Sequence, residues 1–91
     1  MHKNEQPFAY EIAYLIKLQR AKKGVGQVEA AHRCEVSLQC FRNIEARYYT
    51  NRPSFITLKR IEIGLGFNEN QLVKIAYAEL FTMQYRLKEE Q

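Results

Sequence analysis

The side chains best suited to chemistry in this sequence are amides and a guanidinium. Gln39, Arg42 and Asn43 follow Ser37, a favourable helix N-cap, with i, i+3 and i+4 spacing. This spacing places all three on one polar, exposed face of a short helix, where they can form hydrogen bonds. Catalysis by a nucleophile triad or a carboxylate pair has no support, because the chain contains no Asp and His32 has no partner at a suggestive spacing. We therefore expect a binding protein and no enzyme.

The cysteines and histidines do not form a metal site or a disulfide framework. Cys34 and Cys40 are six residues apart, and neither His2 nor His32 completes a set of zinc ligands. We expect no metal, no cofactor and a reducing compartment. Oxidation of Cys40 as a switch is the less favoured alternative to two incidental thiols.

Length and composition exclude several classes of protein. The chain has 91 residues, of which 46% are hydrophobic and 26% charged, so it is long enough for one small globular domain. This excludes a multidomain enzyme and a disordered tail. No apolar run approaches the roughly 20 residues that a membrane span needs, and no apolar signal core follows the N-terminus. We expect a soluble, intracellular protein.

The basic residues are concentrated in the middle of the chain. Residues 17–60 carry ten Lys and Arg against three Glu, a net charge of +7, whereas the whole chain has +4 and the two flanks together −3. A basic middle between acidic ends favours one surface that faces a polyanion. The alternative is an ordinary solvated charged face.

Apolar periodicity and capping residues predict an all-α fold of five helices. The last helix carries no Pro or Gly up to the C-terminus and could extend for about 20 residues, roughly 30 Å. Cap signals suggest that Gly26 precedes the second helix and that Asn68 opens the last. The expected helices are 8–23, 27–34, 38–46, one that restarts after Pro53 and closes near Gly64 and Gly66, and one within 69–91.

Two short helices around residues 35–37 form a unit that can place one helix in the DNA major groove, which is about 12 Å wide. At this point the chain resembles the Cro and lambda-repressor-like helix-turn-helix family, also called XRE. The resemblance covers residues 12–73. The matching residues, in order, are Arg20, Gly24, Val25, Gln27, Ala31, Val36, Ser37, Phe41, Ile44, Glu45, Pro53, Ser54, Leu58, Ile61, Leu65, Gly66, Phe67 and Asn68.

Three residues depart from the family pattern. Gly26 replaces the usual Thr or Ser cap, Glu35 replaces the glycine of the turn, and Arg47 replaces the Gly that often follows the last Glu. A positive φ at Glu35 would cost about 1 kcal/mol. The resemblance implies a five-helix lambda-repressor-like fold with an extended C-terminal helix, in which residues 1–68 are the DNA-binding domain and residues 69–91 form the continuous last helix.

The resemblance also implies roles for individual residues. Gln39 and Asn43 could pair with adenine, Arg42 with guanine, and Leu38 could meet a thymine methyl group. Arg20 and Glu45 would form a structural ion pair. The loop after residue 46 would follow the sugar-phosphate backbone, the alternative being a flexible solvated loop. The implied phosphate contacts are Gln27, Ser37, Cys40, Arg47, Tyr48, Tyr49, Asn51 and Arg52.

The last helix has more apolar surface than one core-facing stripe requires. We expect a two-fold dimer in which these helices pair and set two recognition helices about 34 Å apart. The alternative is that the helix folds back and completes the core of the monomer. The expected interface residues are Val73, Ala76, Tyr77, Leu80, Phe81, Met83 and Leu87.

These features predict a bacterial or phage transcription regulator, cytoplasmic and associated with the nucleoid. We expect a homodimeric repressor that binds a palindromic operator in double-stranded DNA without a cofactor. The alternative is an antitoxin or adaptor that binds a protein partner through the C-terminal helix and whose DNA binding is autoregulatory. RNA binding is less favoured, because the A-form major groove is too narrow for a helix.

Overall fold

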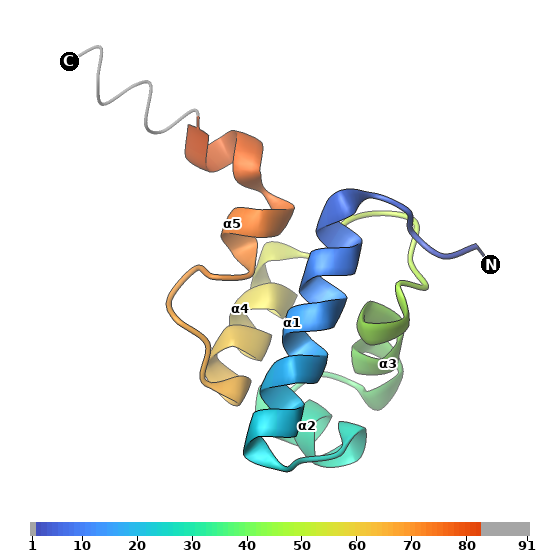
Figure 1. Cartoon of the computed structure of the whole chain (residues 1–91), viewed down its shortest axis with the longest axis vertical. Coiled ribbons are helices and arrows are strands. Elements are labelled where there is room, and N and C mark those ends of the chain that lie inside the picture. Colours follow the sequence, from blue (N-terminus) through green and yellow to red (C-terminus); the bar gives the residue numbers. More distant parts are fainter. Residues whose placement is uncertain (1, 83–91) are drawn as a thin grey trace.

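The computed structural model describes residues 2–82, in which helices and loops are present and strands are absent. The prediction of an all-α chain is confirmed for this part. Figure 1 shows α1 at the centre of the molecule, with α3 and α4 on either side of it and α2 across its C-terminal end. The elements are α1 (Pro7–Lys23), α2 (Gln27–Cys34), α3 (Leu38–Ala46), α4 (Phe55–Leu65) and α5 (Val73–Ala76), with a further helical stretch over residues 78–82.

The first four helices begin and end close to the predicted positions. Ser37 caps α3 by accepting a hydrogen bond from the backbone N–H of Cys40 over 3.0 Å. Ser54 caps α4 in the same way through the backbone N–H of Thr57, at 3.1 Å. Gly66 closes α4 in the left-handed conformation, whereas Gly64 lies inside that helix and does not end it.

Three non-glycine residues among those described adopt the left-handed conformation, Glu35, Arg47 and Asn70, and the first two end helices. Glu35, at the end of α2, has φ 55° and Arg47, at the end of α3, has φ 63°. Both are among the positions where the chain departs from the family pattern, and each conformation costs about 1 kcal/mol relative to glycine. The turn at Glu35 is a regular left-handed helix end, closed by a hydrogen bond of 3.1 Å from the N–H of Val36 to the carbonyl of Ala31.

The core lies where α1 meets the other helices. Its fully buried large side chains come from α1, α3, α4 and α5, and the small residues of α2 let that helix approach α4 closely. A Cβ on Gly64 would lie 2.6 Å from the Cα of Cys34, so this contact requires glycine. The largest core residues are Ile12, Ile16, Phe41, Leu58, Ile61, Leu65, Leu72 and Val73.

The C-terminal region is not the single helix that the sequence predicts. Residues 69–72 are turns, α5 is four residues long, and the backbone breaks at Tyr77, where φ is −124° and ψ 39°. The buried carboxylate of Glu62 holds the turn, because it accepts N–H groups from Asn70 at 2.9 Å, Leu72 at 2.8 Å and Val73 at 3.0 Å. For residues 69–82, the prediction of a helix that begins at residue 69 and continues without a break is therefore wrong.

Two residues of the expected dimer interface belong to the core of the monomer. Val73 and Ala76 are 0% and 3% exposed, because α5 packs against α1 and α4. They cannot contact a second copy, and this expectation is wrong. Leu80 remains 49% exposed and Phe81 is half-buried. The expected interface residues Met83 and Leu87 lie outside the described residues.

No helix among residues 2–82 combines the length and the apolar character needed to cross a membrane.

Candidate nucleic-acid interface

The outer face of α3 presents the polar side chains that the sequence placed there. Phe41 and Ile44 are buried on the inner side and fix the rotation of the helix. On the outer side Gln39 and Arg42 are exposed and Asn43 is partly buried. The amide of Gln39 donates a hydrogen bond to Oδ1 of Asn43 over 2.8 Å, so the two amides form one pair. Leu38, at the start of α3, is partly buried beside them.

Gln27, the first residue of α2, connects this face to the interior. Its Oε1 accepts a hydrogen bond from Nε of Arg42 over 3.3 Å, and its Nε2 donates to Oε1 of Glu45 over 3.1 Å. Both polar atoms of the Gln27 amide are therefore hydrogen-bonded within the protein. The side chain is not the free phosphate ligand that the sequence suggested. Arg42 donates only its Nε to Gln27, and among the described residues both of its terminal nitrogens stay available, in the fork geometry that suits bidentate recognition.

The predicted ion pair between Arg20 and Glu45 is confirmed. Nε of Arg20 lies 2.5 Å from Oε2 of Glu45, and Nη2 lies 2.9 Å from Oε1, so the contact is bidentate. The hydrogen bonding of Arg20 to the Glu45 carboxylate raises the pKa of Arg20. Nη1 of Arg20 also donates to the carbonyl of Val25 over 3.1 Å. The pair therefore fixes α3 to α1 and to the chain leading into α2.

Arg47 holds the N-terminal segment instead of extending into solvent. Its guanidinium lies over the ring of Tyr10, 3.8 Å from the centroid, and its Nη1 donates to the carbonyl of Asn4 over 3.2 Å. The N–H of Asn4 in turn donates to the carbonyl of Arg47 over 2.6 Å, and the Arg47 side chain is only 17% exposed. The expected role of Arg47 as a free phosphate contact is therefore not supported by its surroundings.

The next residues of the loop differ in their accessibility. Tyr48 and Asn51 are exposed, and the ring of Tyr48 lies 5.6 Å from Nζ of Lys3. The hydroxyl of Tyr49 is buried, where it has no hydrogen-bond partner among the described residues, and burial raises the pKa of Tyr49 to about 12. Tyr48 and Asn51 can therefore reach a phosphate, whereas the Tyr49 hydroxyl cannot.

Ser37 and Cys40 are committed to the start of α3. The Ser37 hydroxyl oxygen already accepts the N–H of Cys40, so that N–H is not available to a phosphate. Ser37 itself is exposed, and its hydroxyl hydrogen can still be donated. Cys40 is partly buried, and burial raises the pKa of its thiol.

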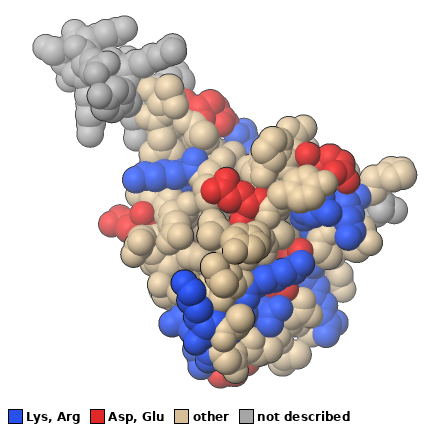
Figure 2. Space-filling model, viewed as in Figure 1, with Lys and Arg blue, Asp and Glu red and all other residues tan. Residues whose placement is uncertain are grey.

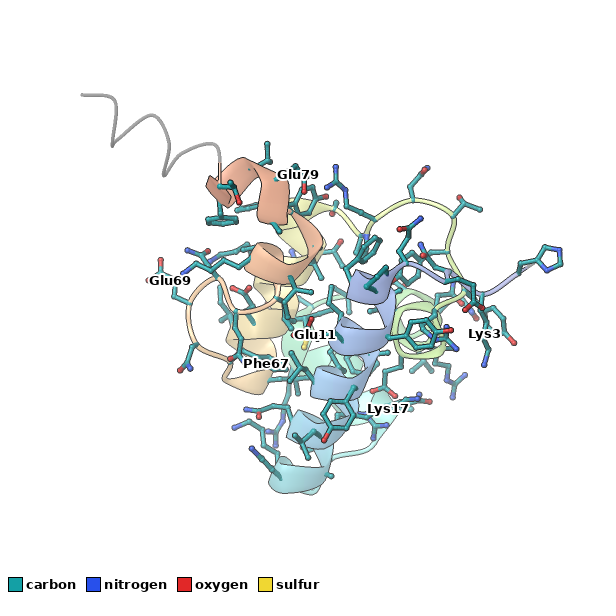
Figure 3. All side chains as sticks on the ribbon, turned by 45° about the horizontal axis from the view of Figure 1, so that its top comes forward. Lys3, Glu11, Lys17, Phe67, Glu69 and Glu79 are labelled. Carbon is teal, nitrogen blue, oxygen red and sulfur yellow. The ribbon has the colours of Figure 1, made fainter. Side chains whose placement is uncertain are left out.

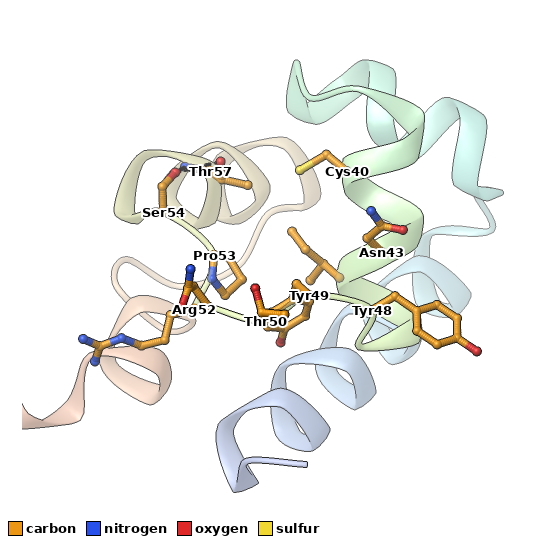
Figure 4. A pocket seen from close by; sticks show the side chains of 11 residues that line it. Cys40, Asn43, Tyr48, Tyr49, Thr50, Arg52, Pro53, Ser54 and Thr57 are labelled. Atoms are coloured by element: carbon orange, nitrogen blue, oxygen red, sulfur yellow. Dashed lines mark hydrogen bonds between the residues drawn. The ribbon is translucent and has the colours of Figure 1, made fainter. Parts of the chain in front are cut away.

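A hollow of about 520 Å³ adjoins the exposed face of α3. Figure 4 shows it between the second half of α3, the loop over residues 48–53 and the first turn of α4. Its lining surface is mostly apolar, although polar side chains contribute to it, among them Asn43 of the exposed face. The residues that bound it include Cys40, Asn43, Thr50, Arg52, Ser54 and Thr57.

Arg52, at the far end of this loop, is engaged with the C-terminal region. Its Nη1 donates to the carbonyl of Ala76 over 3.1 Å and to the carboxylate of Glu79. Its guanidinium also lies over the ring of Tyr77, 4.4 Å from the centroid. No local sequence signal indicates these contacts, because 24 to 27 residues separate the partners. The expected phosphate contact of Arg52 therefore left out the contacts that this side chain makes within the protein.

Charge is unevenly distributed over the visible surface. In the view of Figure 2 the Lys and Arg side chains cover much of the lower part, around the end of α1 and α2, and the Glu side chains lie mainly in the upper part. Residues 17–60, with their net charge of +7, form α2, α3, the last seven residues of α1 and the first six of α4. The basic part of the chain is therefore also the part that carries the exposed face of α3.

Comparison with known proteins gives no match, since no family model, no curated protein and no solved structure is detectably similar to this chain.

Proposed function

We propose that this protein is a sequence-specific regulator of transcription that binds double-stranded DNA. One observation carries the proposal: a short capped helix, α3, exposes two amides and a guanidinium on one face next to a second short helix, α2. A helix of this kind fits the major groove, where every base pair presents a distinct pattern of donors and acceptors. The residue pattern shared with the Cro and lambda-repressor-like family supports the same interpretation.

The exposed side chains have complementary base chemistry. The fork of Arg42 suits O6 and N7 of guanine, and an amide of the pair formed by Gln39 and Asn43 suits N6 and N7 of adenine. Leu38 can contact a thymine methyl group at the edge of the same face. Each well-formed bidentate contact contributes roughly 1–3 kcal/mol of discrimination against the wrong base.

Phosphate binding would come from groups around this face. Tyr48, Asn51 and Ser37 are exposed and carry donors. The first turn of α2 adds backbone N–H groups that no helical carbonyl can accept, at the positive end of the helix dipole. Gln27 therefore contributes through the backbone at the start of α2 more than through its side chain. These contacts would position the protein on DNA without reading sequence.

We infer that the protein acts as a homodimeric repressor at a palindromic operator, because a single α3 reads only a few base pairs. The proposed contact surface is formed by Leu80 and Phe81, which border a hollow of about 290 Å³ together with Phe55. For a two-fold dimer of a helix-turn-helix protein, operator half-sites about one turn of DNA, roughly 34 Å, apart are expected.

The test is a selection from random duplex DNA by the purified parent, by Gln39→Ala and by Asn51→Ala, at one fixed salt concentration. The parent should enrich an inverted repeat. Gln39→Ala should relax the preference at particular bases, whereas Asn51→Ala should weaken binding to all sequences alike. Failure of the parent to enrich any sequence, with only salt-sensitive bulk binding, contradicts the proposal.

A second candidate function is an antitoxin or adaptor that binds another protein. The observation that favours it is the exposure of Phe55 and Leu80, at 45% and 49%, which border the same hollow at the junction of α4 and the C-terminal region. Sedimentation analysis separates the two. A protein that stays monomeric and binds no duplex would leave this apolar surface to a different partner.

A further inference from the structure

The loop that ends at Arg52 is tied to the C-terminal region by one guanidinium. Arg52 donates to the carbonyl of Ala76, the last residue of α5, and to the carboxylate of Glu79 in the following helical stretch. The hydrogen bond to Glu79 raises the pKa of Arg52 and, in return, the bond from Arg52 lowers the pKa of Glu79. Both groups are therefore charged, and Glu79 is the anion that Arg52 binds in this structure.

Tyr77 builds the junction around this ion pair. Its ring lies beneath the guanidinium of Arg52 and meets the ring of Phe55 edge-on, with 6.1 Å between the ring centroids. Its hydroxyl donates to the carbonyl of Pro53 over 2.8 Å. The backbone break at Tyr77 is thus held in place by Arg52, Pro53 and Phe55, and Glu79 lies within hydrogen-bonding distance of Arg52.

We propose that Glu79 and a DNA phosphate compete for Arg52, so that the segment over residues 77–79 is an autoinhibitory contact on the DNA-binding loop. The inference rests on the proposed function, because it takes the loop at Arg52 to be the one that follows the DNA backbone. Residues 77–79 would then regulate DNA binding by this loop. Arg52 lies in the same loop as the exposed Tyr48 and Asn51 and lines the hollow beside α3.

An exposed ion pair is a suitable contact for this purpose. The side chains of Arg52 and Glu79 are 40% and 57% exposed, and such pairs contribute little because water and salt screen them. A phosphate can therefore displace the carboxylate. By linkage, any event that moves residues 77–79 away from the loop should raise the affinity for DNA, and DNA should loosen this segment by the same factor.

A purely structural role of Arg52 predicts a different change in DNA affinity when Glu79 is replaced. If Arg52 served only to cap α5 and shape the loop, loss of Glu79 would loosen the loop and leave DNA affinity unchanged or lower. Competition instead predicts a gain of affinity when Glu79 loses its charge. The sign of the change therefore separates the two explanations.

The experiment measures the affinity of Glu79→Gln for the duplex selected by the parent, or for a random-sequence duplex if none is selected. Glu69→Gln is the matched control, because it removes the same charge from the loop between α4 and α5, which Figure 3 shows on a different edge of the molecule from Glu79. Both changes are repeated in an Arg52→Gln background, where Gln keeps a donor for the carbonyl of Ala76.

We expect Glu79→Gln to bind about two- to fivefold more tightly than the parent, the range of an exposed ion pair. Glu69→Gln should change the affinity by less, and the gain from Glu79→Gln should disappear in the Arg52→Gln background. An equal gain from both changes, a gain that persists without Arg52, or no gain at all overturns the inference while DNA binding stands. Absence of duplex binding by the parent and by every variant overturns the proposed function and this inference together.

Discussion

Replacement of Glu45 by Gln removes the negative charge from the most buried ion pair among residues 2–82. The Glu45 side chain is 2% exposed and its carboxylate receives three hydrogen bonds, two from Arg20 and one from Gln27. These contacts join the end of α3 to α1 and to the start of α2. The change leaves the volume nearly unaltered, so its effect reports the electrostatics and hydrogen bonding of this site.

The magnitude follows from burial. Removing one partner of a fully buried pair costs roughly 3–5 kcal/mol, because the remaining charge is left without compensation. Arg20 is 21% exposed, and the Gln oxygen can still accept one of its N–H groups, so part of that cost is recovered. We expect a loss of about 2–3 kcal/mol, which lowers the Tm of a domain of this size by roughly 8–20 °C.

Urea unfolding followed by circular dichroism, together with a thermal melt, measures this loss. Glu29→Gln is the matched control, because Glu29 forms an exposed pair with Arg33, at 2.8 Å within α2, and its loss should cost less than about 0.5 kcal/mol. If Glu45→Gln melts at the temperature of the parent, the pair does not stabilise the fold and the reasoning is refuted. A double-mutant cycle with Arg20→Met then shows whether the two residues are coupled at all.

Further predictions concern the core and the buried titratable groups. Gly64→Ala should cost about 1–3 kcal/mol in urea unfolding, because the new methyl group would overlap Cys34. Gly26→Ser should be neutral or slightly stabilising, since nothing lies within 4 Å of a Cβ there and Ser can cap α2. At about pH 8 iodoacetamide should modify Cys40 well before Cys34, which is 1% exposed and whose pKa burial raises to about 11; equal rates in mass spectra would contradict this. Burial also raises the pKa of Tyr49 to about 12. The folded protein therefore holds the protons of the Cys34 thiol and the Tyr49 hydroxyl more tightly than the unfolded chain does. The free energy of unfolding should be constant up to about pH 9 and fall as the pH rises toward 12. The fall should be smaller in Cys34→Ala.

Local signals were sufficient to locate the first four helices. Capping by Ser37 and Ser54 and the stop at Gly66 act within a few residues, so the sequence predicts them directly. The same holds for the exposed face of α3, because helical spacing alone assigns Gln39 and Arg42 to the side opposite Phe41. The family resemblance added the pairing of α1 with α3, which no local signal contains.

The C-terminal region shows where such reasoning fails. Residues 69–82 have no proline or glycine, and their apolar pattern is compatible with one long helix. The structure instead ends α5 at Ala76, because Glu62 binds three N–H groups before the helix and Arg52 binds the carbonyl at its end. Both partners are ten or more residues away from most of the groups they bind, so no local pattern could reveal them.

The sequence by itself determined the helical class, the bounds of the first four helices and the composition of the α3 face, because capping, glycine stops and helical periodicity act over a few residues. Tertiary structure decided which of the polar groups remain free. Gln27, Arg47 and Arg52 have the right chemistry for phosphate, but contacts with Glu45, Asn4 and Glu79 occupy them. These contacts join residues 18 to 43 positions apart, and only the packing of the helices brings such partners within hydrogen-bonding distance.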